Sequence, residues 1–165
     1  MLTWGWRMID FAKRNHPGRD PGSVALGAVA LALGLPAAAQ AGAWEAFEAR
    51  CLSALQDFAP PVVAGLGPGT RDGAVTRYAL GGERVLRTEA APDDGRRACA
   101  VHDPAGAPVP GFDAWIGDAV QAGRYVPVAA GRWHSHRWSE PVLEVQKTRA
   151  GGALTLRILE TNLEA

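Results

Sequence analysis

An uncharged apolar segment from Ser23 to Ala43 limits what this chain can fold into more than any other feature. It reads SVALGAVALALGLPAAAQAGA and ends in small residues, with Ala39-Gln40-Ala41 as an A-x-A match. That order is typical of the apolar core and cleavage region of an export signal. We therefore expect residues 1–41 to be an export signal with an extended, mixed-charge n-region, and Gly42 to begin a periplasmic or secreted mature protein.

A retained membrane anchor over residues 23–43 is the alternative interpretation of the same segment. At ~1.5 Å of rise per residue, a helix of this length could cross a hydrocarbon core of ~30 Å. Pro36 and the small residues that follow it weaken the apolar character of the second half. Cleavage is therefore the favoured interpretation, and an uncleaved segment would anchor the protein to the inner membrane.

The chain that remains after cleavage, residues 42–165, has 124 residues and suits a single globular domain. It carries 13 Lys and Arg residues against 15 Asp and Glu residues. A nucleic-acid-binding protein would need a basic excess on one face. We therefore expect no nucleic-acid partner, and membrane contact only through an uncleaved N-terminal segment.

Both cysteines, Cys51 and Cys99, fall within the mature part of the chain. Two cysteines in one small exported domain are most simply a disulfide. A reactive thiol is the alternative, because His102 follows Cys99 by three residues. The surrounding residues have strand character, however, and an offset of three on a strand points two side chains to opposite faces. The sequence therefore predicts a disulfide between Cys51 and Cys99.

Two segments have the apolar spacing of amphipathic helices. The first runs from Trp44 to Phe58, with apolar side chains at three- and four-residue intervals. The second is expected from Asp113, as the N-cap, to about Ala122, with Phe112 placed as a staple residue before the cap.

The remaining segments alternate polar and apolar residues, as strands do. The expected strands cover residues 74–80, 83–89, 96–102, 141–147 and 153–160, with Gly81-Gly82 as a hairpin turn. In the last hairpin, Leu143 and Val145 are expected on one face with Leu154, Leu156 and Ile158, and Glu144 is expected to meet Arg157 on the other.

The predicted fold class is therefore α+β. An antiparallel sheet of about five strands has two helices packed on one face, in the order α-β-β-β-α-β-β, and the signal segment precedes it.

The stretch WHSHRW, residues 133–138, is the most conspicuous chemical motif. On a strand, His134 and His136 point to the same face, roughly 6.6 Å apart along the chain. Such a pair can supply two imidazoles to zinc or copper, and a third ligand would be needed. The candidate third ligands are His102, Asp103 and Glu140.

Catalysis by the same motif is not expected. Ser135 points away from both histidines on a strand, and the chain has no G-x-S-x-G nucleophile elbow. The aromatic and arginine content instead suggests a partner-binding surface, because Trp, Tyr and Arg dominate the energetics of protein interfaces. The partner-binding candidates are Tyr125, Trp133, Arg137 and Trp138.

The function expected from the sequence is that of a small exported accessory or binding protein. It is non-enzymatic, has no cofactor, is held by one disulfide, and has another envelope protein as its partner. The alternative is a metal-binding or metal-dependent protein that uses His134 and His136 for zinc or copper.

Overall fold

The computed structural model describes residues 42–90, 96–136 and 141–161 of this chain. The predicted export signal, residues 1–41, lies outside these ranges, and so does the alternative anchor 23–43 apart from its last two residues. Arg137, Trp138 and Glu140 also lie outside them. Within the described ranges, no helix is both long and apolar enough to span a membrane.

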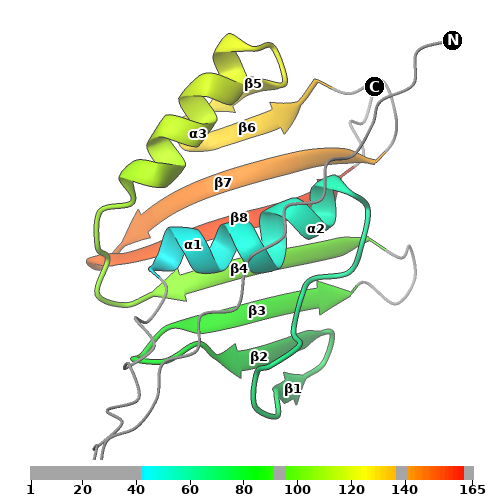
Figure 1. Cartoon of the computed structure of the whole chain (residues 1–165), viewed down its shortest axis with the longest axis vertical. Helices are drawn as coiled ribbons and strands as arrows, with labels where there is room; N and C mark the ends of the chain where they lie inside the picture. The colour runs from blue at the N-terminus through cyan, green and yellow to red at the C-terminus, as the bar shows by residue number, and fades with distance from the viewer. Residues whose placement is uncertain (1–41, 91–95, 137–140, 162–165) are drawn as a thin grey trace, which may run out of the picture. The chain divides into compact units, whose positions relative to one another are not determined.

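The strands form one antiparallel sheet in the order β1-β2-β3-β4-β8-β7-β6-β5 (Figure 1). The eight strands are β1 Thr70–Asp72, β2 Val75–Ala79, β3 Val85–Ala90, β4 Arg97–Asp103, β5 Tyr125–Ala129, β6 Arg132–Ser135, β7 Val142–Ala150 and β8 Ala153–Thr161. The α+β class is confirmed, but the expected sheet of about five strands is wrong. The order of elements is one helical segment, four strands, one helix and four strands.

The additional strands are ones that lack a clear sequence pattern. β1 has three residues, too few to show alternation, and follows the glycine-rich stretch GLGPG. β5 contains Pro127, which is tolerated because this strand lies at the edge of the sheet, with an irregularity between Pro127 and Ala129. β6 has four residues, which are also too few to show a clear alternation.

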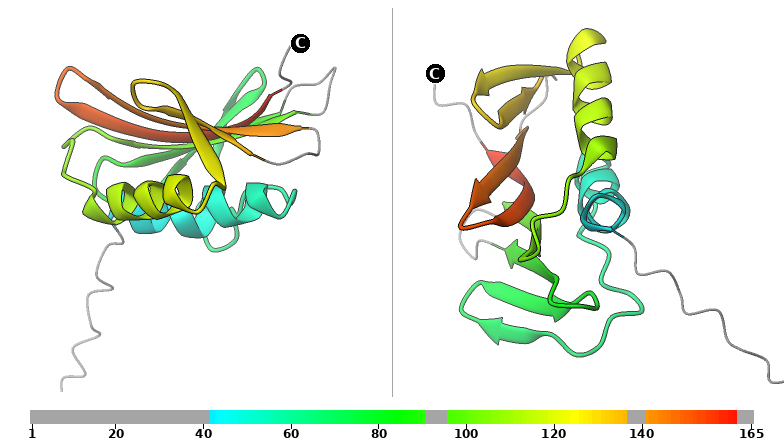
Figure 2. Two further views of the ribbon diagram at one scale, coloured as in Figure 1. Left: turned by 90° about the horizontal axis from the view of Figure 1, so that it is seen from above. Right: turned by 90° about the vertical axis from the view of Figure 1, so that its left-hand side faces the viewer.

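Both helical segments lie on the same face of the sheet (Figure 2). The first is continuous and consists of α1 Ala43–Phe47, the π-helical turn η1 Glu48–Leu52 and α2 Ser53–Gln56; the second is α3 Pro110–Gln121. α3 begins three residues before the predicted cap Asp113, because Pro110 occupies the first helical turn, where its missing N–H costs nothing. Asp113 instead pairs with Lys147.

The core lies between the helices and the sheet. Its largest fully buried side chains include Phe47, Leu55, Phe112, Leu156 and Ile158. The predicted apolar face of the last hairpin is confirmed: Val145 pairs with Ile158, which puts Leu143, Val145, Leu154, Leu156 and Ile158 on one face, and all five are buried.

A disulfide joins the first helical segment to the centre of the sheet. Cys51 lies in η1 and Cys99 on β4, with a Cα–Cα distance of 5.3 Å, so the predicted pairing is confirmed. Both residues are almost completely buried. Closing a loop with a sequence separation of 48 residues removes chain entropy worth about 4 kcal/mol in the loop-length model.

Candidate binding face of the sheet

The open face is the face of the sheet opposite the helices. Cys99 lies on the helix side because its sulfur is bonded to the helical segment. Side chains alternate between the two faces along each strand, so the strand pairing assigns every other residue to the open face. Its charged and imidazole side chains are Asp72, Arg77, Arg87, Glu89, His102, Arg132, His134, Glu144 and Arg157.

Four arginines lie in a single cross-strand row of the open face. From β2 to β6 the row reads Arg77, Arg87, Ala100, Arg157, Gln146 and Arg132. A neighbouring row, two residues along each strand, holds the carboxylates Asp72, Glu89 and Glu144. Positive and negative charges therefore lie in adjacent rows, with the uncharged Ala98 and Leu159 between Glu89 and Glu144.

Glu144 is the most enclosed of these carboxylates, and its side chain is 5% exposed. Arg132 donates to both of its oxygens, from Nε at 2.9 Å and Nη2 at 2.8 Å. His134 Nε2 lies 2.7 Å from Oε2, and Gln146 donates to Oε1. Burial alone would raise the pKa of Glu144, but the hydrogen bonds from Arg132, Gln146 and His134 outweigh it and lower this pKa to about 2.

The predicted histidine pair is divided between a strand and the residue after it. His134 is on β6, and its Nε2 carries the hydrogen because an ionised carboxylate only accepts. His136 directly follows β6, and its backbone N–H donates to the carbonyl of Arg124.

The suggested third metal ligands do not join this pair. His102 Nδ1 lies 3.1 Å from Thr155 Oγ1 on the central strands, and Asp103 accepts from the Ala105 N–H on the helix side. Glu140 lies outside the described residues. Within the described ranges, no group of three or more His, Cys, Asp or Glu side chains could hold a metal ion.

The aromatic residues proposed for partner binding lie on the helix side. Tyr125 is 3% exposed, and its ring packs on Trp115 at 5.4 Å between centroids. Trp133 packs on Phe112 at 5.8 Å. Tyr125 therefore has little surface to offer a partner, and both rings contribute to the core. Arg137 and Trp138 lie outside the described residues.

Arg87 is the least satisfied arginine of the row. Its Nη2 lies 3.6 Å from Glu89 Oε1, while Arg157 Nη2 lies only 2.9 Å from the other oxygen of the same carboxylate. The Nε of Arg87 is buried and has no hydrogen-bond partner in the described part of the chain. The Glu89 carboxylate is thus shared by Arg87 and Arg157, and the buried Nε–H of Arg87 has no acceptor among the described residues.

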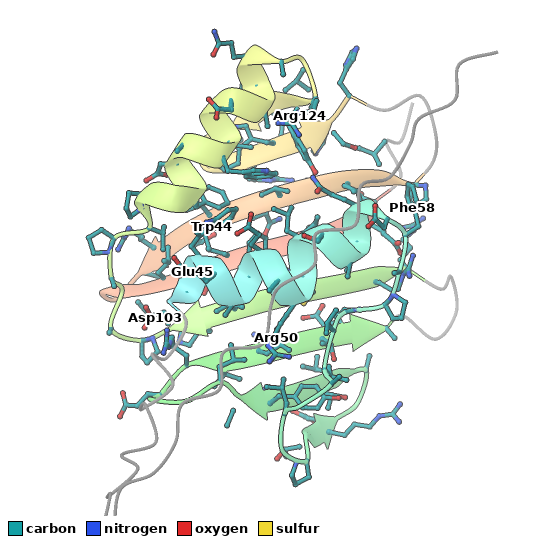
Figure 3. The ribbon with its side chains drawn as sticks, viewed as in Figure 1. Trp44, Glu45, Arg50, Phe58, Asp103 and Arg124 are labelled. Carbon is teal, nitrogen blue, oxygen red and sulfur yellow. A yellow bond between two sulfur atoms is a disulfide. The ribbon has the colours of Figure 1, made fainter. Side chains whose placement is uncertain are left out.

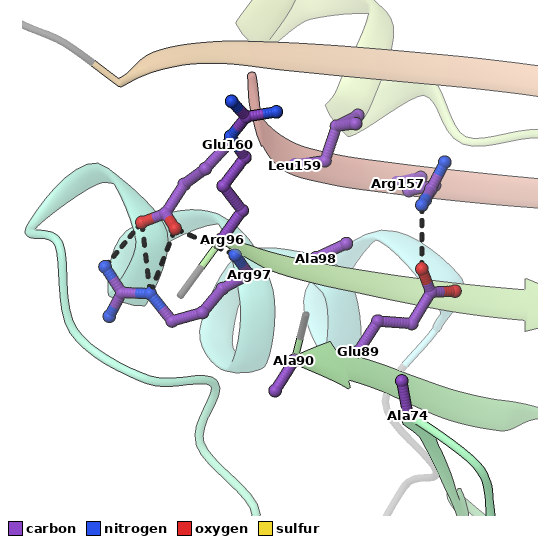
Figure 4. A pocket seen from close by; sticks show the side chains of 9 residues that line it. All are labelled: Ala74, Glu89, Ala90, Arg96, Arg97, Ala98, Arg157, Leu159 and Glu160. Atoms are coloured by element: carbon purple, nitrogen blue, oxygen red, sulfur yellow. Dashed lines mark hydrogen bonds and ion pairs between the residues drawn. The ribbon is translucent and has the colours of Figure 1, made fainter. Parts of the chain in front are cut away.

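A pocket of about 230 Å³ lies where β3, β4 and β8 are side by side, and residues of both faces of the sheet line it (Figure 4). Two ion pairs line it, Arg157 with Glu89 on the open face and Arg97 with Glu160 on the helix side. The Arg97 backbone N–H also donates to Glu160, at 2.8 Å. Glu89 and Glu160 therefore each form an ion pair with an arginine of the same chain.

Sequence reasoning did not identify the arginine row. It expected Glu144 to meet Arg157, which is wrong: Glu144 pairs with Leu159, and Arg157 with Gln146. The register is set by the tight turn at Gly151 and Gly152, both with positive φ, rather than by a longer loop. The alternation of polar residues on β6, β7 and β8 predicted a polar face of the sheet. It could not predict which side chains pair with each other on that face.

Neither a protein family model, nor a curated protein, nor a solved structure matches this chain. Function must therefore be inferred from the geometry of the molecule.

Proposed function

We propose that this protein is a small exported binding protein, non-enzymatic and without a cofactor, that contacts another envelope protein through the open face of its sheet. The single observation that carries the proposal is the row of four arginines beside a row of carboxylates on the face that the helices leave uncovered.

The arginines of the row are not equally paired with carboxylates, and this supports a binding role over a purely structural one. A charged face that only stabilised the sheet would match each arginine with a carboxylate. Arg87 instead shares Glu89 with Arg157 and has a buried, unpartnered Nε. An unsatisfied buried donor costs about 1–3 kcal/mol, and an acceptor from a partner would remove that cost if Arg87 moved to meet it.

The disulfide supports export to an oxidising compartment. Such bonds persist in the periplasm and outside cells, and are rare where thiols are kept reduced. Together with the apolar segment Ser23–Ala43, it favours a periplasmic or secreted protein, with an inner-membrane anchor as the alternative.

The test is site-specific photo-crosslinking in the native cell. A photoreactive residue replaces Thr148, which is exposed on the open face, or Asp118, which is exposed on α3. We expect a discrete covalent adduct with one envelope protein from position 148, lost when Arg87→Gln is added, and none from position 118. Equal adducts from both positions, or none from 148, would contradict the proposal.

Metal binding is a second candidate, because the hydrogen bond between His134 and Glu144 is of a kind that orients metal-binding imidazoles. Metal-bound histidines commonly donate their other ring N–H to a carboxylate. With Nε2 directed at Glu144, His134 would use Nδ1, and His136 would be the second ligand for zinc or copper; of the three candidate third ligands only Glu140, which lies outside the described residues, remains.

Titration of the purified protein with zinc and with copper tests this second function. Its affinity should fall at least tenfold in the double variant His134→Ala/His136→Ala. Equally weak binding in both proteins would exclude the metal function and leave the binding-protein proposal untouched.

A further inference from the structure

A groove of about 350 Å³ lies between residues of the chain segment 57–69 and strands β1–β3, on the helix side of the sheet. Its volume is at the small end of the range for ligand pockets, about 300–1,000 Å³. Pro60, Pro61 and Val63 line it from the segment, and Thr76, Tyr78 and Thr88 are among the residues that line it from the strands.

The segment that forms the outer wall is held in a fixed position. Arg50 extends from the first helical segment (Figure 3), and its Nη1 donates to the carbonyls of Val62 and Ala64, at 3.0 and 3.2 Å. The Val62 N–H donates back to the carbonyl of Arg50. Arg97 Nη1 donates to the carbonyl of Phe58 at 2.8 Å. Because Arg50 and Arg97 are close in sequence to the two disulfide cysteines, the wall is tied to the most constrained part of the fold.

This wall exposes apolar side chains. Phe58, Val62 and Val63 are three of the five large apolar side chains that are exposed in the described ranges. Exposed apolar side chains gathered in one place often mark a binding site. Val63 lines the groove together with the two prolines, so the groove has an apolar side that does not depend on a flexible loop.

The strand side of the groove carries hydrogen-bond donors in one cross-strand row. Arg71 on β1 pairs with Thr76 on β2, and Thr76 pairs with Thr88 on β3, which places the three on the helix side about 4.8 Å apart. Arg71 Nε donates to the Gly73 carbonyl, and no carboxylate of the described residues lies within ion-pair distance of it. Neither threonine hydroxyl has a hydrogen-bond partner within the same ranges. All three have spare capacity to donate.

Glu89 is the acidic residue among those that line the groove, but its carboxylate lies on the open face, where two arginines bind it. Glu89 accepts from Arg157 at 2.9 Å and lies near Arg87. Arg71 therefore leaves a positive charge at the edge-strand end of the groove, opposite an apolar wall. That combination favours a ligand with one negative charge and an apolar body.

We propose that this groove binds a small free monocarboxylic acid with an apolar chain. Its carboxylate accepts hydrogen bonds from Arg71 and from the hydroxyls of Thr76 and Thr88. Its chain packs between Val63 of the wall and the ring of Tyr78.

Calorimetric titration of the purified protein with butyrate, hexanoate and octanoate tests the apolar part. Affinity should rise along this series, about fourfold for each CH₂ that is buried. Octanamide, which keeps the chain but lacks the charge, should bind about tenfold more weakly than octanoate. No saturable binding of octanoate at millimolar concentration, no dependence on chain length, or equal binding of octanamide would each overturn the proposal.

Substitutions locate the site. Arg71→Gln should weaken octanoate binding about tenfold, and Thr88→Val severalfold. Arg124→Gln, at an arginine that is also exposed and lies just before β5, should leave the affinity unchanged. An equal loss in Arg124→Gln would show nonspecific anion binding and overturn the assignment. Amide shifts on octanoate addition, measured by NMR, should centre on Thr76 and Thr88, and shifts confined to other residues would also overturn it.

Discussion

Arg157 on β8 reaches over the intervening strand β4 to bind Glu89 on β3, with 2.9 Å between Nη2 and Oε2. The reach is possible because the residues of β4 that face the open side here are Ala98 and Ala100, which pair with Glu89 and Arg157 respectively. Two small side chains therefore allow a charge pair to connect strands that are not neighbours.

Removing the charge of Glu89 should destabilise the sheet by about 1 kcal/mol, because Arg87 and Arg157 would then face each other without a carboxylate. The Glu89 side chain is 30% exposed, so solvent screens part of the effect. Urea unfolding of Glu89→Gln measures it. Asp72→Asn is the matched control, since Asp72 is 75% exposed and its loss should cost less than about 0.5 kcal/mol. Equal costs for the two would contradict the central role of Glu89.

Loss of the disulfide should lower the free energy of unfolding by about 4 kcal/mol. The comparison is between the wild type and the double variant Cys51→Ala/Cys99→Ala, by urea unfolding without reductant. Adding reductant should shift the wild type toward the variant and leave the variant unchanged. Mass spectrometry after alkylation without reductant should find no labelled thiol, and two labelled thiols would contradict the bond.

The stability of the protein should depend on pH through Glu144. Its pKa is about 2 in the folded protein, below the ordinary value of 4.5. A lowered folded-state pKa contributes stability that is present above pH 4.5 and lost as the pH falls toward 2. The contribution is on the order of 3 kcal/mol at neutral pH.

Urea unfolding of the wild type and of Glu144→Gln between pH 7 and pH 2.5 checks this. The stability gap between the two proteins should narrow below about pH 4.5 as the wild-type carboxylate becomes protonated. A gap that stays constant over the whole range would show that Glu144 is not stabilised as a carboxylate.

The parts of the fold that could be predicted are those with a local periodic signal. The helix that begins near Trp44, the hairpin of β7 and β8, and the pairing of the only two cysteines follow from spacing and composition. The repeated order of one helical segment and four strands does not, because β1, β5 and β6 are too short or too irregular to show alternation.

The candidate face was harder to predict because it depends on register between distant strands. Arg87 and Arg157 lie 70 positions apart in the chain and meet through Glu89 only because β3, β4 and β8 are neighbours in the sheet. Strand alternation did correctly separate His134 from Trp133 and Ser135. It could not show that Glu144 would bind His134 and Arg132 rather than Arg157.

Phe58 ends the first helical segment with a positive φ of 55°, a conformation that favours glycine. Its N–H donates to the carbonyl of Leu55, and the next N–H, that of Ala59, donates to Ala54, so the backbone hydrogen bonds require this conformation. Phe58→Gly should therefore be more stable than Phe58→Ala by about 1 kcal/mol, because both lose the ring and only glycine relieves the strain. Urea unfolding of the two variants measures the difference. If Phe58→Ala equalled or exceeded Phe58→Gly in stability, the left-handed conformation at this position would carry no strain.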